Sequence, residues 1–201
     1  MREITELLPL VNPFAPSLPE PTAVQWLRWA AIEFCKSTRV WRDERRFEVI
    51  GGADEQFCMP EYAAIHDIER AWFGTRELEP LPFGRAPTLR EDSQPIYLSQ
   101  VAPDTVRLVP GAQESGELVL HMFLKPSSTA EDLPDMLIDH YGQQLAEGAL
   151  SRILLLPNQP FTDLNMAMAY GQSFQAALDK NFLLNIRGQQ RARARTKASY
   201  L

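Results

Sequence analysis

The stretch Thr22–Glu44, "TAVQWLRWAAIEFCKSTRVWRDE", carries the clearest structural signal in the chain. Its apolar residues recur at spacings of three and four, which is typical of a helix with one buried face. These core positions are Leu27, Ala31, Phe34, Cys35, Thr38 and Trp41. Charged side chains such as Arg28 and Lys36 occupy the other side. The pattern predicts one long amphipathic helix and treats Trp41 as its last core residue.

The flanking segments on both sides of this helix have different patterns. Five prolines between Pro9 and Pro21 exclude a regular helix, so we expect extended chain there, after a short amphipathic turn at Ile4–Leu8. After the helix, alternating polar and apolar residues predict five or six short antiparallel strands over residues 45–126, with an exposed loop at residues 80–95. The strand-like runs are "RRFEVI", "AAIHDIERAWF", "PIYLSQ", "TVRLV" and "ELVLHMFLKP".

The helical period returns after residue 127. Asp132 is a candidate cap for a helix whose apolar stripe continues as far as Pro157. The residues of this stripe are Leu137, Tyr141, Leu145, Ala149, Ile153 and Leu154. A last helix is expected from Thr162 or Asp163 to about Arg195, with its distal end projecting beyond a compact domain. Its predicted stripe is Ala167, Tyr170, Phe174, Leu178 and Phe182.

These elements together predict an α+β fold. The first helix and a C-terminal helical hairpin, in residues 1–44 and 127–187, form a helical bundle that buries the three apolar stripes. Residues 45–126 form an inserted antiparallel β lobe. Residues 188–201 form an extended basic tail.

The composition is ordinary for a globular protein, with 201 residues, 45% hydrophobic and 23% charged. No apolar run approaches the roughly 20 residues of a membrane span, and the N-terminus lacks the pattern of a signal peptide. Two cysteines, Cys35 and Cys58, cannot build a disulfide framework. We interpret both as small buried hydrophobes in a protein of the reducing cytoplasm.

Residues with catalytic potential are scattered. His66, His121 and His140 have no metal-ligand spacing, and the chain has no CxxC pair, P-loop, GxGxxG or GxSxG motif. Surface or half-buried roles are the simplest interpretation of these histidines. The sequence therefore predicts no enzyme, no metal site and no cofactor, and a hydrolase acting on the cell envelope is the least favoured class.

Aromatic residues outside the core stripes are better candidates for function. Trp26 and Trp29 point in different directions from the first helix, so at least one is expected on a surface that another chain covers. Trp72 and Phe73 lie in a strand-like segment. These four residues are the candidate subunit or tail interface.

The chain ends in a basic segment, "RGQQRARARTKASYL". It carries five positive charges and no acidic residue, whereas the whole chain has a formal net charge of −6, which leaves −11 for residues 1–186. A nucleic-acid hook, an arm that docks on an acidic partner and a solvated terminus remain open as interpretations. The residues concerned are Arg187, Arg191, Arg193, Arg195, Lys197 and Tyr200.

Three parts of the sequence resemble the head-to-tail adaptor (connector) proteins of tailed bacteriophages. The first is the opening, with a Pro-containing loop and a helix bearing Ala30, Ala31, Phe34, Cys35, Thr38, Trp41 and Arg42. The second is the run "RRFEVIGGADEQFCMPEYAAIHDIERAWFGTRELEP". The third is the end, where "YGQQLAEGALSRILLLP", "PFTD" and "YGQSFQAAL" are similar to the family's helical hairpin.

The resemblance implies a structural virion protein of the neck, assembled in the host cytoplasm, without catalysis or cofactor. Its implied partners are the portal protein, tail proteins and further copies of itself in a ring, typically of twelve. DNA would pass through the ring's channel without sequence-specific binding. The basic tail would then dock on the portal. The alternative is a nucleic-acid-binding accessory protein that acts through the tail.

Overall fold

The computed structural model describes residues 1–52, 56–81 and 94–187. The fold is α+β, as predicted, and the chain divides into two compact units. Unit 1 consists of Met1–Val40 and the chain from Asp132 onward, and unit 2 is Trp41–Glu131. Each unit is described by itself.

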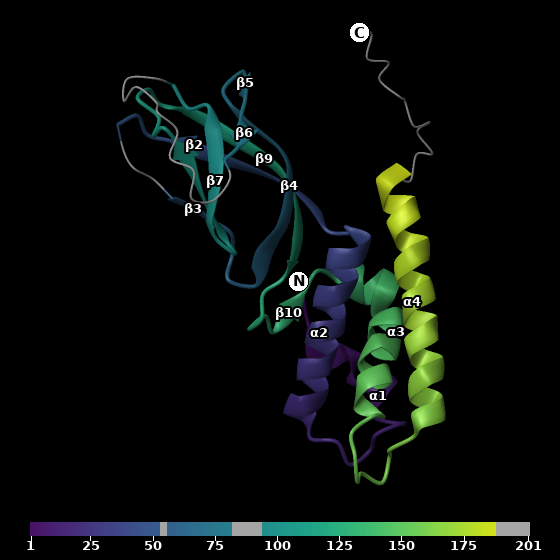
Figure 1. Cartoon of the computed structure of the whole chain (residues 1–201). Helices are drawn as coiled ribbons and strands as arrows, with labels where there is room; N and C mark the ends of the chain where they lie inside the picture. Colours follow the sequence, from purple (N-terminus) through teal and green to yellow (C-terminus); the bar gives the residue numbers. More distant parts are fainter. Residues whose placement is uncertain (53–55, 82–93, 188–201) are drawn as a thin grey trace. The chain divides into compact units, whose positions relative to one another are not determined.

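Unit 1 is a helical bundle. Its long helices are α2 (Glu20–Thr38), α3 (Asp135–Ile153) and α4 (Leu164–Arg187), which lie side by side in Figure 1. The short elements η1 (Ile4–Leu7) and α1 (Leu8–Val11) pack against α2 and α3. Two-residue strands β1 (Arg2–Glu3) and β10 (Asp132–Leu133) pair antiparallel.

Phe34 lies at the centre of this bundle, fully buried. Its ring is 4.8 Å from that of Tyr141 on α3 and 6.3 Å from that of Phe174 on α4, measured between centroids. Leu145 and Ala149 on α3 and Leu178 on α4 are also buried, as their stripes predict. Burial of a Phe side chain of this kind stabilises a fold by about 1.5–3 kcal/mol.

The ends of the helices differ from the sequence prediction. α2 stops at Thr38, where Arg39 adopts a left-handed conformation with φ 51°, so Trp41 is not the last core residue of the helix. It packs instead against the core of unit 2. α3 begins at Asp135, and Asp132 lies in β10 rather than capping the helix.

The last helix is described as far as Arg187, and its predicted extension to Arg195 falls outside the described residues. Figure 1 shows the C-terminal end of α4 projecting past the ends of α2 and α3. Phe182, predicted as part of the buried stripe, is 38% exposed near that end.

The described part of unit 2 forms two four-stranded sheets. The order of the first is β2-β9-β4-β5, all antiparallel, and the order of the second is β3-β8-β7-β6, in which only the short pair β6–β7 is parallel. The strands are β2 (Arg42–Val49), β3 (Gln56–Cys58), β4 (Ala63–Phe73), β5 (Arg76–Glu77), β6 (Glu79–Pro80), β7 (Tyr97–Ala102), β8 (Thr105–Val109) and β9 (Gly116–Pro126). Most of the predicted 80–95 loop lies outside the described residues.

The central strand β9 shows why this region forms a sheet. Leu118, Leu120, Met122 and Leu124 are all at most 2% exposed, and the residues between them are half-buried except for Phe123, which is 3% exposed. This period of two directs one row of side chains into the core between the sheets. None of the described helices combines the length and the hydrophobicity of a membrane-spanning segment.

Candidate protein interface

Two tryptophans meet on the outer side of α2. Trp29 is 52% exposed and Trp26 is half-buried, and their rings form an edge-to-face pair with centroids 5.4 Å apart. Both residues lie outside the core stripe of the helix, whose buried positions include Ala23, Leu27 and Ala31. The two rings, expected from the sequence to point in different directions, thus contact one another at the surface of unit 1.

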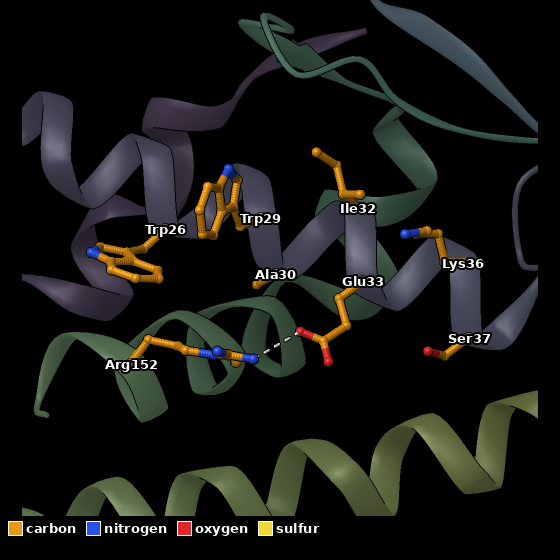
Figure 2. Close-up of a pocket in the computed structure, with 9 residues that line it drawn as sticks. Trp26, Trp29, Ala30, Ile32, Glu33, Lys36, Ser37 and Arg152 are labelled. Atoms are coloured by element: carbon orange, nitrogen blue, oxygen red, sulfur yellow. Dashed lines mark hydrogen bonds and ion pairs between the residues drawn. The ribbon is translucent and has the colours of Figure 1, made fainter. Parts of the chain in front are cut away.

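The pair borders an open pocket of about 620 Å³, which we call the tryptophan pocket. Its lining residues come from α2 and α3: Trp26, Trp29, Ala30, Ile32, Glu33, Lys36, Ser37, Gly148 and Arg152. Figure 2 shows the tryptophans toward one end and Lys36 and Ser37 toward the other. Glu33 and Arg152 face one another between the two helices.

Gly148 is one of the two α3 residues that line the pocket. An added Cβ at Gly148 would lie 2.8 Å from Cε2 of Phe174, which is closer than real Cβ contacts allow. Gly148 therefore permits the close packing of α3 against α4. Arg152 lies one helical turn later on α3, and Figure 2 shows its side chain reaching toward Glu33.

The charges of the pocket are accessible to solvent. Nη2 of Arg152 is 3.4 Å from Oε2 of Glu33, and both side chains are about half exposed, at 55% and 48%. An exposed ion pair of this kind contributes little to stability, typically below about 1 kcal/mol. Its polar groups and the neighbouring Trp29 are therefore available to a partner. Trp and Arg dominate the energetics of many protein interfaces.

The other two predicted interface residues lie on β4 in unit 2. Trp72 is half-buried, and its ring lies edge-to-face against that of His121 with centroids 4.7 Å apart. Nε2 of His121 is 3.4 Å from Oε2 of Glu44. Trp72 therefore belongs to a polar–aromatic cluster of the first sheet.

Phe73 is not a surface residue, so its prediction as an interface residue is wrong. Its side chain is 7% exposed and belongs to the core of unit 2. An added Cβ at Gly116 would lie 2.8 Å from Cζ of its ring, which shows how closely the ring packs on β9. Alternation along β4 places Phe73 and Trp72 on opposite faces of the sheet.

The predicted docking residues of the tail lie at and beyond the end of α4. Arg187 is the last residue of the helix. The remaining candidates are outside the described residues: Arg191, Arg193, Arg195, Lys197 and Tyr200. Their role stays a prediction.

The two cysteines differ. Cys35 is fully buried in the bundle, and burial raises the pKa of its thiol well above the ordinary value. Cys58 is exposed, so its prediction as a buried hydrophobe is wrong. Phe57 takes the inward position of β3, and the pleat turns Cys58 outward. The described residues contain no group of three or more His, Cys, Asp or Glu side chains that could hold a metal ion.

Sequence reasoning missed Glu33, Lys36, Gly148 and Arg152 as pocket residues. The available signal was the spacing of Gly148 and Arg152 by one helical turn, which places a small residue and a cation on one face of α3. An open aromatic pocket with exposed charges, on a small helical bundle, is typical of proteins that work by binding other proteins.

The family of the chain agrees with this class. The SU10 adaptor protein family matches residues 2–199, nearly the whole chain, and the chain belongs to this family of phage head-to-tail adaptors. The resemblance found in the sequence is thereby confirmed. No curated protein matches the chain at a significant level.

Proposed function

We propose that this adaptor forms a ring beneath the portal of the filled capsid, extends the DNA channel and provides a platform for the tail. The observation that carries the proposal is the family match over residues 2–199. The role is structural, in the virion neck, and needs no cofactor. Portal, tail proteins and further copies of the chain are the proposed partners, with assembly in the host cytoplasm.

The tryptophan pocket is proposed to contribute to the contact between neighbouring copies in the ring. A cyclic assembly needs two different surfaces on each copy, because each subunit meets one neighbour on either side. Unit 1 has exposed apolar side chains on more than one helix. Trp29 lies on α2, whereas Leu164 and Met168, which are 62% and 63% exposed, lie on α4. These are candidates for the two sides of the contact.

Replacement of Trp29 by Ala tests this role of the pocket. The substitution also removes the edge-to-face contact with Trp26, so we expect the free energy of unfolding to fall by about 0.5–1.5 kcal/mol, with the protein still folded. Assembly into rings in the presence of the portal, measured by electron microscopy and sedimentation velocity, should be lost. The control is Ile50→Ala, which removes a 64% exposed apolar side chain from unit 2 and should leave assembly intact. Normal rings with Trp29→Ala but loss of tail attachment would assign the pocket to the tail.

The basic tail is proposed to dock on the portal. Its positive charge complements an acidic surface, which would steer docking. The formal charge of −11 on residues 1–186 suits a body that lets DNA slide past without adhering. Deletion of residues 188–201 should leave thermal stability unchanged and abolish portal attachment. A truncated protein that attaches normally but loses affinity for DNA would instead favour the nucleic-acid-binding function.

Salt dependence does not distinguish these two outcomes, because both contacts are ionic. The informative measurement is therefore which partner is lost. A matched variant in which Arg191, Arg193 and Arg195 are replaced by Gln keeps the length of the tail and removes three charges. It should weaken portal attachment as the deletion does if charge drives docking.

A further inference from the structure

The strand β2 forms a long edge of the first sheet in the described part of unit 2. It pairs with β9 on one side and is the terminal strand of its sheet. The strand has eight residues, whereas the strands at the other sheet edges, β3, β5 and β6, have three or two. Alternate backbone N–H and C=O groups on the outer side of such an edge can pair with another strand.

The exposed face of β2 has a regular charge pattern. Arg42, Glu44, Arg46 and Glu48 are all exposed and alternate in sign along the strand. Nη2 of Arg46 is 2.7 Å from Oε1 of Glu44, so the two charges lie within the same row. The guanidinium of Arg42 lies over the ring of Phe123 at 5.2 Å from its centroid.

When two copies of β2 run antiparallel, the charge pattern of one strand is complementary to that of the other. We propose that β2 pairs antiparallel with β2 of a second copy, about a twofold axis at Arg45, so that their two sheets continue into one. In this register Glu44 lies opposite Arg46 of the second copy, and Arg42 lies opposite Glu48. The symmetry repeats both pairs, so all four charges of each outer row face an opposite charge.

The neighbouring registers that keep both cores on the same side are unfavourable. A twofold axis at Glu44 places Arg42 opposite Arg46 of the other copy and the two Glu44 side chains opposite one another. An axis at Arg46 places Glu44 opposite Glu48 and the two Arg46 side chains together. Like charges directly opposite one another are destabilising. Registers centred nearer either end of the strand are complementary over a shorter overlap.

The inner row of β2 consists of the residues between the exposed charges, Asp43, Arg45 and Phe47, and of Val49. This row is compatible with the same register. It places the two Arg45 side chains opposite one another, each already bonded to Asp43 of its own strand at 2.6 Å between Nε and Oδ2. The two Asp43 carboxylates would flank the two guanidinium groups diagonally, within reach of long side chains. The repulsion between the arginines is thereby offset.

This contact is independent of the proposed ring. It is isologous, since the same strand is used by both copies, and it involves unit 2 rather than the tryptophan pocket. It would pair two free subunits in solution. The second copy is identified as the partner by the self-complementary charges, which a strand from an unrelated protein would have no reason to match.

The experiment compares two charge reversals, alone and mixed. Wild-type protein without the portal at low ionic strength should sediment as a dimer of the 22.8 kDa chain. Glu44→Arg and Arg46→Glu should each weaken the dimer by about tenfold or more, because two cross-strand pairs turn from attraction to repulsion. An equimolar mixture of the two variants should form a heterodimer, since every reversed charge then faces an opposite one.

The matched control is Glu69→Arg, the same charge reversal at an exposed position on β4, which β9 separates from β2 in the sheet. It should dimerise like the wild type. Circular dichroism of each variant establishes that it is folded. A monomeric wild type, single variants that dimerise normally, or a mixture of folded variants that stays monomeric would each overturn the proposal.

Discussion

Replacement of Gly148 by Ala tests the packing that forms both the bundle and the floor of the tryptophan pocket. The added methyl group would meet Cε2, Cδ2 and Cζ of Phe174 at 2.8, 2.9 and 3.0 Å. Phe174 is 6% exposed, so its ring has little space into which it can move. One of the two helices must shift, or the ring must leave its preferred rotamer.

The expected cost follows from two opposing effects. Overpacking of a core by a methyl group costs about 1–3 kcal/mol. Ala is favoured over Gly in a helix by about 1 kcal/mol, which offsets part of that cost. Gly171 on α4 provides the matched control, because an added Cβ there lies 3.7 Å from the nearest atom, Cβ of Ser151, an ordinary contact. Gly171→Ala should therefore stabilise the protein by about 1 kcal/mol.

The assay is urea unfolding followed by helical circular dichroism, which reports on unit 1. The difference between the two variants isolates the packing cost and should be about 1–3 kcal/mol, with Gly148→Ala the less stable. In a Phe174→Leu background the cost of Gly148→Ala should shrink, because the ring that it meets has been removed. Equal stability of the two Ala variants would refute this interpretation of Gly148.

Three further predictions concern single side chains. Above about pH 9 the unfolded chain releases the Cys35 proton while the folded chain keeps it, because burial raises the pKa of this thiol. The free energy of unfolding should therefore fall with rising pH, by at most about 1.4 kcal/mol per unit, and Cys35→Ala should remove that slope. A thiol reagent should label Cys58 in the native protein and Cys35 only after unfolding. Asp163 Oδ1 accepts hydrogen bonds from the backbone N–H groups of Asn165 and Met166, so Asp163→Ala should cost about 0.5–2 kcal/mol in a thermal melt and Asp163→Asn less.

The periodicity of apolar residues in the sequence was sufficient to predict much of the fold. The stripe through Leu27 and Phe34 and the alternation through Leu118 and Leu120 each correspond to buried rows. A period of 3.6 or 2 can be recognised because it depends only on local geometry and on which face is covered. This is why the helical hairpin and the antiparallel strands were predictable.

The ends of elements were not predictable in the same way. The helical pattern runs on to Trp41, but α2 stops at Thr38 because Arg39 turns left-handed, a conformation that is uncommon for residues other than glycine. Similarly, the pleat of β3 and β4 decides that Cys58 is exposed and Phe73 buried. These outcomes depend on tertiary packing rather than on local spacing.

Only the tryptophans on the α2 side of the tryptophan pocket were predictable from the sequence. Trp26 and Trp29 stand out because they fall outside the stripe of their own helix. Arg152 is 119 residues from Glu33 in sequence, and only the packing of α3 against α2 brings the two together. The electrostatics of the pocket therefore could not be derived before the fold was known.

Electron cryomicroscopy of the full-length protein mixed with the portal of the same phage tests the central proposal most directly. We expect a closed ring of copies seated on the portal, with the basic tails in contact with the portal and Trp26 and Trp29 covered by a neighbouring copy. Single copies that leave the portal unoccupied under conditions in which both proteins are folded would contradict the proposed function.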